Sequence, residues 1–264
     1  LNEFEDVLNS LLHIRNADVY VTGSNSKFLS SDVITQFRGR GDEIHVYPLS
    51  FSEYVPAYQG SVDEAWDDYL IYGGMPLILT MAEPEDKAAY LNSLFQKVYI
   101  SDIVERHDVR NKVELDELVD ILASAIGSYT NQSKLVRTFK SVKGKTISDK
   151  TIKNYIDYLI DSFLISKAVR YDIKGKKYIG SPSKYYFEDV GLRNARLGFR
   201  QVEQTHLMEN IIYNELRIRG YHVDVGVVEY YGVNGEGKRG KKQLEVDFVA
   251  TKGSEKHYIQ SAFT

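Results

Sequence analysis

The feature that most constrains the fold lies in residues 19–55, where strand-like and helix-like runs alternate. The apolar run DVYVTG ends in a polar turn, KFLSSDVITQF has helical spacing, and EIHVYPL is a second strand-like run. An amphipathic stretch, FEDVLNSLLHI, precedes them. This alternation is typical of α/β proteins with a parallel sheet. We therefore predict that residues 1–60 form part of such a sheet, and that the natural domain begins upstream of Leu1.

Composition limits the kinds of site that the chain can carry. Its 264 residues are 43% hydrophobic, which suffices for real cores. Cysteine is absent, so neither a disulfide framework nor a thiolate metal site can form. No run approaches the ~20 apolar residues of a membrane span. We expect a cytoplasmic prokaryotic protein that does not bind membranes.

Residues 61–196 are predicted to be mainly helical, with a break at Gly73, Gly74 and Pro76. Within them, residues 131–180 read as a helix at about 133–142, a second helix capped by Ser148 and running to Phe163, and a ribbon with its tip at residues 174–177. Helix, turn, helix and basic hairpin together predict a winged helix-turn-helix.

Residues 197–264 are predicted to form a small α/β domain. The amphipathic helix HLMENIIYNELRIRG ends at Gly220, and three strands follow in YHVDVGVVEYY, QLEVDFVAT and KHYIQSAF. We interpret the lysine-rich loop GEGKRGKK as a hairpin tip and not as a dedicated nucleic-acid patch.

Charge is distributed unevenly. Residues 134–180 carry +8, whereas the whole chain carries -4. This excess indicates a polyanionic partner such as double-stranded DNA, although a solvated basic face or a protein-binding winged helix would look the same. The candidate phosphate contacts are Lys134, Arg137, Lys140, Lys150, Lys153, Lys174, Lys176 and Lys177.

Two polar groups follow the first strand-like run. Ser24 and Asn25 stand in a turn from which a side chain could reach a γ-phosphate or orient water, and Arg38 and Arg40 could neutralise charge in phosphoryl transfer. A helix cap and helix C-terminal charges are the structural alternatives. The GKT of residues 144–146 is not a P-loop, because Phe139 stands where the first glycine is required.

The runs VTGSNSKFLSSDVITQFRGRGDEIHVYPLSFSEYV, YLIYGGMPLIL and HLMENIIYNELRIRGYHVDVG, with LEVDFVA and YIQSA, resemble a prokaryotic group of AAA-type ATP-binding proteins. These carry a C-terminal winged helix and a restriction-endonuclease-like domain. The resemblance implies a P-loop and Walker B strand before Leu1, a sensor-1 turn at Ser24 and Asn25, and an arginine finger at Arg38 or Arg40. The intact protein would use ATP and Mg, whereas this chain alone should not hydrolyse ATP.

The last block resembles PD-(D/E)XK nucleases, in which acidic groups hold a metal ion and a lysine helps to activate water. The resemblance places Glu209, Asp247 and Gln260 at the acidic positions and Ala262 at the lysine position. We therefore expect a degenerate, non-cleaving domain. The alternatives are an active metal-dependent nuclease and a non-catalytic scaffold that binds a protein partner or itself.

Overall fold

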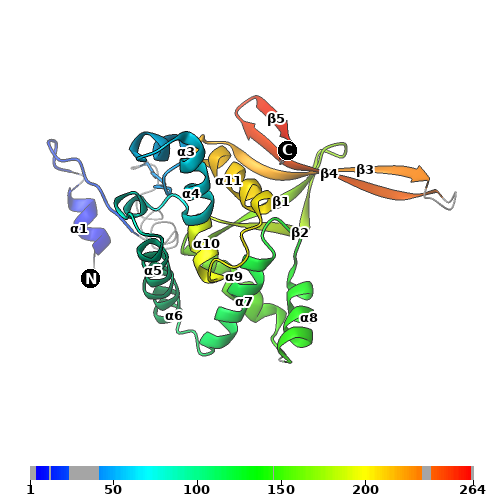
Figure 1. Ribbon diagram of the computed structural model, residues 1–264, viewed down its shortest axis with the longest axis horizontal. Helices are drawn as coiled ribbons and strands as arrows, with labels where there is room; N and C mark the ends of the chain where they lie inside the picture. Colours follow the sequence, from blue (N-terminus) through cyan, green and yellow to red (C-terminus); the bar gives the residue numbers. More distant parts are fainter. Residues whose placement is uncertain (1–3, 12, 24–41, 145, 234–238, 263–264) are drawn as a thin grey trace.

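The computed structural model describes residues 4–11, 13–23, 42–144, 146–233 and 239–262 (Figure 1). Helices occupy most of the first two thirds of this part, and a sheet occupies most of the last third. The helices are α1 (Phe4–Leu11), α3 (Phe51–Tyr54), η2 (Val55–Ala57), α4 (Val62–Tyr72), η3 (Pro76–Thr80), α5 (Pro84–Leu94), η4 (Phe95–Ile100), α6 (Ser101–Arg106), α7 (Lys112–Ser124), α8 (Gln132–Lys143), α9 (Asp149–Asp161), α10 (Val190–Arg196) and α11 (Gln204–Ile218).

Local sequence explains where several of these helices begin. Ser50 and Ser61 each form a capping box with the glutamate three residues later, and Asn131 and Ser148 accept hydrogen bonds from backbone N–H groups in the first turn. Caps of this kind satisfy donors that a helix start leaves unpaired. The predicted cap at Ser148 is confirmed.

Within the described residues, the sheet has five strands in the order β2-β1-β3-β4-β5. Its strands are β1 (Ile165–Asp172), β2 (Lys177–Phe187), β3 (His222–Val233), β4 (Arg239–Lys252) and β5 (Glu255–Ile259). Neighbouring strands are antiparallel except β1 and β3, which are parallel. The sheet therefore takes strands from both sides of the domain boundary expected at residue 196.

One large core joins the helices to this sheet. Fully buried Leu118, Phe139 and Leu159 from α7, α8 and α9 belong to the same apolar cluster as Val225 and Phe248 from β3 and β4. A smaller cluster joins α3, α4, α10 and α11. The mixed α/β class and the helical second block are confirmed, as are the helices at 132–143 and 149–161 and the hairpin that follows them.

The two strands predicted near the N-terminus are wrong. Residues 18–23 and 43–49 are described, and neither run forms a strand. Their side chains do not lie in a sheet: Tyr20 is 83%, Ile44 79% and Val46 87% exposed. A strand is stable only when neighbours complete its hydrogen bonds and cover its side chains. The predicted helix at 27–37 lies outside the described residues.

Candidate functional site

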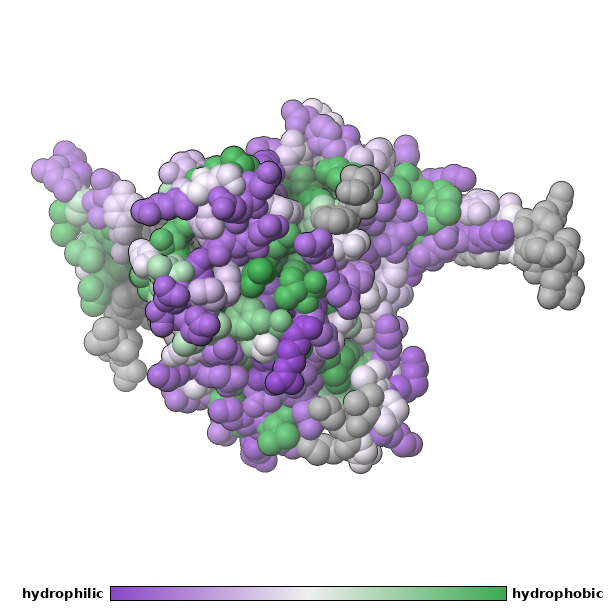
Figure 2. Space-filling model, in the orientation of Figure 1, coloured by the Kyte–Doolittle hydropathy of each residue, from purple (hydrophilic) through white to green (hydrophobic). Residues whose placement is uncertain are grey.

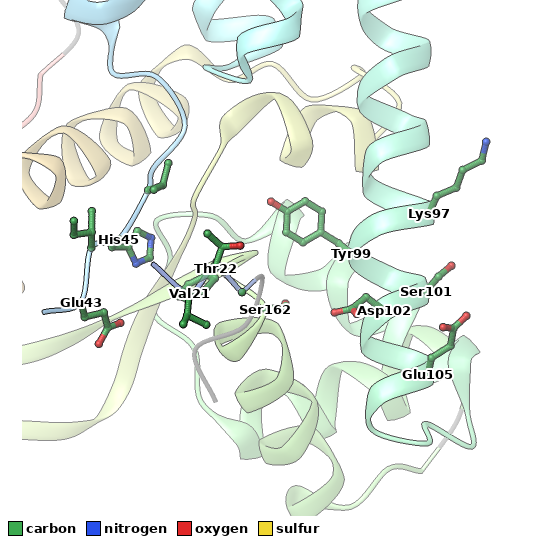
Figure 3. Close-up of a pocket in the computed structure, with 14 residues that line it drawn as sticks. Val21, Thr22, Glu43, His45, Lys97, Tyr99, Ser101, Asp102, Glu105 and Ser162 are labelled. Carbon is green, nitrogen blue, oxygen red and sulfur yellow. The ribbon is translucent and has the colours of Figure 1, made fainter. Parts of the chain in front are cut away.

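The candidate site is a pocket of about 630 Å³, lined in part by Val21, Thr22 and Gly23. Residues 21–23 and 43–46 form one side, η4 and α6 form another, and the end of α9 closes it (Figure 3). The lining side chains with polar atoms include Thr22, Glu43, His45, Lys97, Tyr99, Ser101, Asp102, Glu105 and Ser162. Ser24, Asn25, Arg38 and Arg40 lie outside the described residues.

The described lining is acidic. Glu43, Asp102 and Glu105 line the pocket together with one lysine, Lys97, whose side chain points away from Val21 and Thr22 in Figure 3. Asp102 accepts a hydrogen bond from Arg106 Nη2 at 2.7 Å. Carboxylates repel phosphate oxygens, and Lys97 is the one lysine or arginine among the described lining residues.

Residues 45–47, of which His45 also lines the pocket, contact the α9/β1 connection and α11 through aromatic rings. The ring of His45 stacks on Tyr47 with centroids 4.0 Å apart and contacts Phe163 edge-on at 4.7 Å. Burial lowers the pKa of His45, which favours its neutral form. The Arg217 guanidinium of α11 lies 5.4 Å from the Tyr47 ring centroid. Residues 45–47 therefore connect the pocket to α9 and α11.

The same segment reaches the glycine pair at the end of α4. Leu49 N–H donates to the Gly74 carbonyl at 2.8 Å, and the Tyr69 hydroxyl donates to the Leu49 carbonyl at 2.7 Å. A Cβ on Gly74 would lie 2.2 Å from the Leu49 oxygen. Only glycine permits this approach, so the predicted chain break at Gly73 and Gly74 is also a docking point.

A buried carboxylate fixes that docking point from the other side. Asp189 caps α10 by accepting from Leu192 N–H at 2.9 Å, and its second oxygen accepts from Gly74 N–H at 2.7 Å. Burial raises the pKa of Asp189 to about 6, against three backbone N–H donors that lower it. Sequence reasoning missed this residue, because nothing local shows that Asp189 reaches a loop 115 residues away.

The predicted nuclease-like residues are brought together only in part. Asp247 Oδ2 accepts from Gln260 Nε2 and from Ser261 N–H, both at 2.7 Å. Glu209 Oε1 instead accepts from Lys184 Nζ at 2.9 Å and from the Tyr186 hydroxyl at 2.6 Å. In the described part of the chain, no three His, Cys, Asp or Glu side chains are grouped so that they could hold a metal ion.

Lys184 contacts the predicted nuclease-like residue Glu209, and nothing in the sequence indicated this contact. Its ammonium lies on β2, almost fully buried, between Glu209 at 2.9 Å and Glu245 at 2.6 Å. Burial alone would lower the pKa of Lys184, but the two carboxylates raise it. Asp247 lies on β4, between β3 and β5, and is buried, so it is not a polar residue of an edge strand.

The predicted phosphate contacts are exposed but spread over three elements. Lys134, Arg137 and Lys140 lie on α8, and Lys150 and Lys153 on α9. Lys153 pairs with Asp157 at 3.1 Å. The remaining contacts, Lys174, Lys176 and Lys177, lie at the β1/β2 turn and the start of β2.

Helix α9, the second helix of the predicted winged helix-turn-helix, is packed on more than one side. Its apolar residues enter the core, and Tyr158 stacks on His107 with ring centroids 3.7 Å apart. In Figure 1, α8 lies below the sheet, whereas the turn lies at the base of the β3/β4 hairpin, where Ile173 N–H donates to the Val227 carbonyl. These residues therefore do not form one compact surface.

Comparison with known families places the chain. A family profile described as a domain of unknown function (DUF8612) matches residues 63–203, and one described as an AAA domain matches residues 1–55. The chain belongs to the DUF8612 family. The AAA match supports an AAA-type, nucleotide-binding relation for the N-terminal segment, in agreement with the resemblance above. The winged-helix and nuclease-like assignments stay predictions.

Two uncharacterized proteins are similar over nearly the whole chain. One, from Haemophilus influenzae, is 35% identical over 265 residues, which is 98% of this chain and 62% of the relative. The other, from Methanocaldococcus jannaschii, is 29% identical over 258 residues, or 93% of this chain and 55% of the relative. The chain thus spans less than two thirds of either relative. Among the described helices, none has the length and apolar character needed to cross a membrane.

Proposed function

We propose that this chain is the C-terminal part of an AAA-type ATP-binding protein, in which nucleotide state controls binding to DNA or to a protein partner. One observation carries the proposal. The segment that follows the predicted sensor and arginine residues is attached to α9, α11 and the Gly74 loop through His45, Tyr47 and Leu49. A shift of this segment would therefore reach the whole body.

Coupling of this kind requires an element that two sites bias in common. The candidate element is the joint formed by Leu49, Gly74 and Asp189. Asp189 caps α10 and holds Gly74, and Gly74 holds Leu49, so displacement of residues 43–49 strains the start of α10. Helix α10 packs on α4, α5 and α7. The joint thus links the ATPase-like segment to the helical body.

The test uses the full-length protein with ATP, ADP or no nucleotide. Binding to a labelled duplex, and capture of protein partners, should differ between nucleotide states. Tyr47→Ala should weaken that difference while leaving nucleotide-free binding within about twofold, because the Tyr47 ring holds residues 45–47 against Arg217 of α11. Val113→Ala, at a 54% exposed site on α7, is the matched control. Identical binding in every nucleotide state would overturn the proposal.

This chain alone is expected not to hydrolyse ATP. It has no P-loop sequence, and the described pocket lining is acidic. Phosphate release measured across a gel-filtration peak should stay at the blank level. Turnover that follows the protein peak would contradict this expectation.

Metal-dependent nuclease activity is the second candidate, favoured by one contact. Asp247 and Gln260, at adjacent positions of the predicted motif, meet at 2.7 Å. Plasmid incubated with Mg²⁺ or Mn²⁺ tests it: cleavage that is lost in Asp247→Ala would establish a nuclease. Uncut plasmid would support a degenerate, non-cleaving domain.

A further inference from the structure

The hairpin of β3 and β4 extends from the body as a two-stranded ribbon. Strand β1 pairs with β3 only as far as Val227, and β5 pairs with β4 only from Phe248 onward. Beyond these points the described pairs run from Val228↔Leu244 to Val233↔Arg239 and have no third strand. Figure 1 shows this ribbon projecting from the sheet. We call residues 228–233 and 239–244 the arm.

The β1/β2 turn lies at the base of the arm. Ile173 N–H donates to the Val227 carbonyl at 2.9 Å, which holds the turn against β3. Asp172 is 6% exposed and accepts from Gly175 N–H at 2.9 Å, so its charge is used inside the turn. Lys174, Lys176 and Lys177 are exposed. The turn therefore presents three cations beside the arm.

The arm carries the same sign of charge together with an exposed aromatic ring. By sequence, Arg239, Lys241 and Lys242 of the arm are basic and Glu229 is acidic. Tyr231 lies opposite Lys241 in the register and is 82% exposed. Figure 2 shows mainly hydrophilic residues along this projection. Tyr231 is therefore not a residue of the hydrophobic core.

We propose that the arm and the β1/β2 turn together form a binding surface for duplex DNA, which replaces the interpretation of residues 239–242 as part of a hairpin tip alone. A two-stranded ribbon has the width that the major groove admits, and lysines at its base can contact the flanking phosphates. The inference rests on the DNA branch of the proposed function and moves the contact away from α9. That helix is held by the core and by the His107–Tyr158 stack.

The experiment measures anisotropy of a labelled 20-bp duplex, an arbitrary length of about two turns, at about 50 and 200 mM salt. Lys174→Glu combined with Lys177→Glu should lower affinity at least tenfold and reduce the salt slope by about two, because each phosphate contact contributes about 0.9. The matched control is Lys134→Glu combined with Arg137→Glu on α8, with the same charge change. It should lower affinity less than threefold.

Tyr231→Ala separates a positioned arm from diffuse electrostatic attraction. The substitution removes a ring and no charge, so affinity should fall about three- to tenfold while the salt slope stays the same. All altered side chains are exposed. Circular dichroism and melting curves should therefore match the parent chain and exclude misfolding as the cause.

The outcomes separate this inference from the proposed function. Loss of binding in the α8 control with retention in the turn and Tyr231 variants would overturn the arm assignment and leave DNA binding standing. Tighter binding to a single strand of the same sequence would overturn the duplex-groove assignment. No binding at 50 mM salt would overturn both the inference and the DNA branch, leaving nucleotide-dependent protein capture as the separate test of the proposed function.

Discussion

Residues 43–47 and strand β3 have similar sequences and opposite environments. EIHVY and HVDVGV both alternate apolar and polar residues. In β3, Val223, Val225 and Val227 are at most 5% exposed, whereas Ile44 and Val46 are 79% and 87% exposed. The difference comes from neighbours: β3 lies between β1 and β4, and the described residues supply no such partners to 43–47. Strand propensity thus depends on the surface offered to it.

The largest expected effects come from packed sites outside both segments, and the first is the contact between α10 and α4. A Cβ on Gly191 would lie 2.0 Å from the Tyr72 carbonyl oxygen, a backbone atom that cannot move alone. Gly191→Ala should lower the free energy of unfolding by about 3 kcal/mol or more. Urea titration checks this. Gly240→Ala, where a Cβ meets nothing within 4 Å, should change stability by less than about 0.5 kcal/mol. Equal effects would show that the α4/α10 contact is loose.

Lys184 provides an effect of comparable size. Lys184→Met removes the partner of two carboxylates, one of them buried, and should cost about 3–5 kcal/mol, because a buried charge loses its compensation. Lys153→Met breaks an exposed pair with Asp157 and should cost under about 0.5 kcal/mol. Adding Glu209→Gln to Lys184→Met should recover part of the loss. A double variant no more stable than Lys184→Met would refute the charge argument.

Asp189 should make the stability of the joint depend on pH. Its folded pKa of about 6 lies above the ordinary value of 3.8. Because the folded pKa is raised, the protonated carboxyl contributes its whole stabilisation below about pH 4. This stabilisation is lost as the pH rises through 6. The free energy of unfolding should therefore fall by up to about 3 kcal/mol over that interval. The contribution of Asp189 is measured as the difference between the urea midpoints of the parent chain and of Asp189→Asn at each pH. A difference that rises with pH would mean that the N–H donors outweigh burial.

The sequence predicted elements whose signals are local and missed features that depend on distant contacts. Ser148 marked the start of α9, and Gly220 marked the end of α11 with its φ of +80°. Lys184 gave no signal, because its partners are 25 and 61 residues away in sequence. Asp189 was missed for the same reason. The predicted N-terminal strands failed because apolar alternation indicates a strand without saying whether a neighbour is present.

The smallest expected effect probes that last point directly. Ile44→Thr with Val46→Thr should change the stability of this chain by less than about 0.5 kcal/mol, because both side chains are exposed. Val225→Thr, in β3, should cost about 1–3 kcal/mol because it buries a hydroxyl. Thermal or urea unfolding measures both.

The same pair of substitutions in the longer protein sharpens the comparison. If residues 43–47 form a covered strand in the longer protein, Ile44→Thr with Val46→Thr should lower its free energy of unfolding by about 1–3 kcal/mol. This is the cost expected for Val225→Thr. A cost under about 0.5 kcal/mol in both proteins would mean that this run never enters a sheet. Its role would then be restricted to the ring contacts of His45 and Tyr47, and coupling would pass through these rings and the backbone hydrogen bond of Leu49 to Gly74.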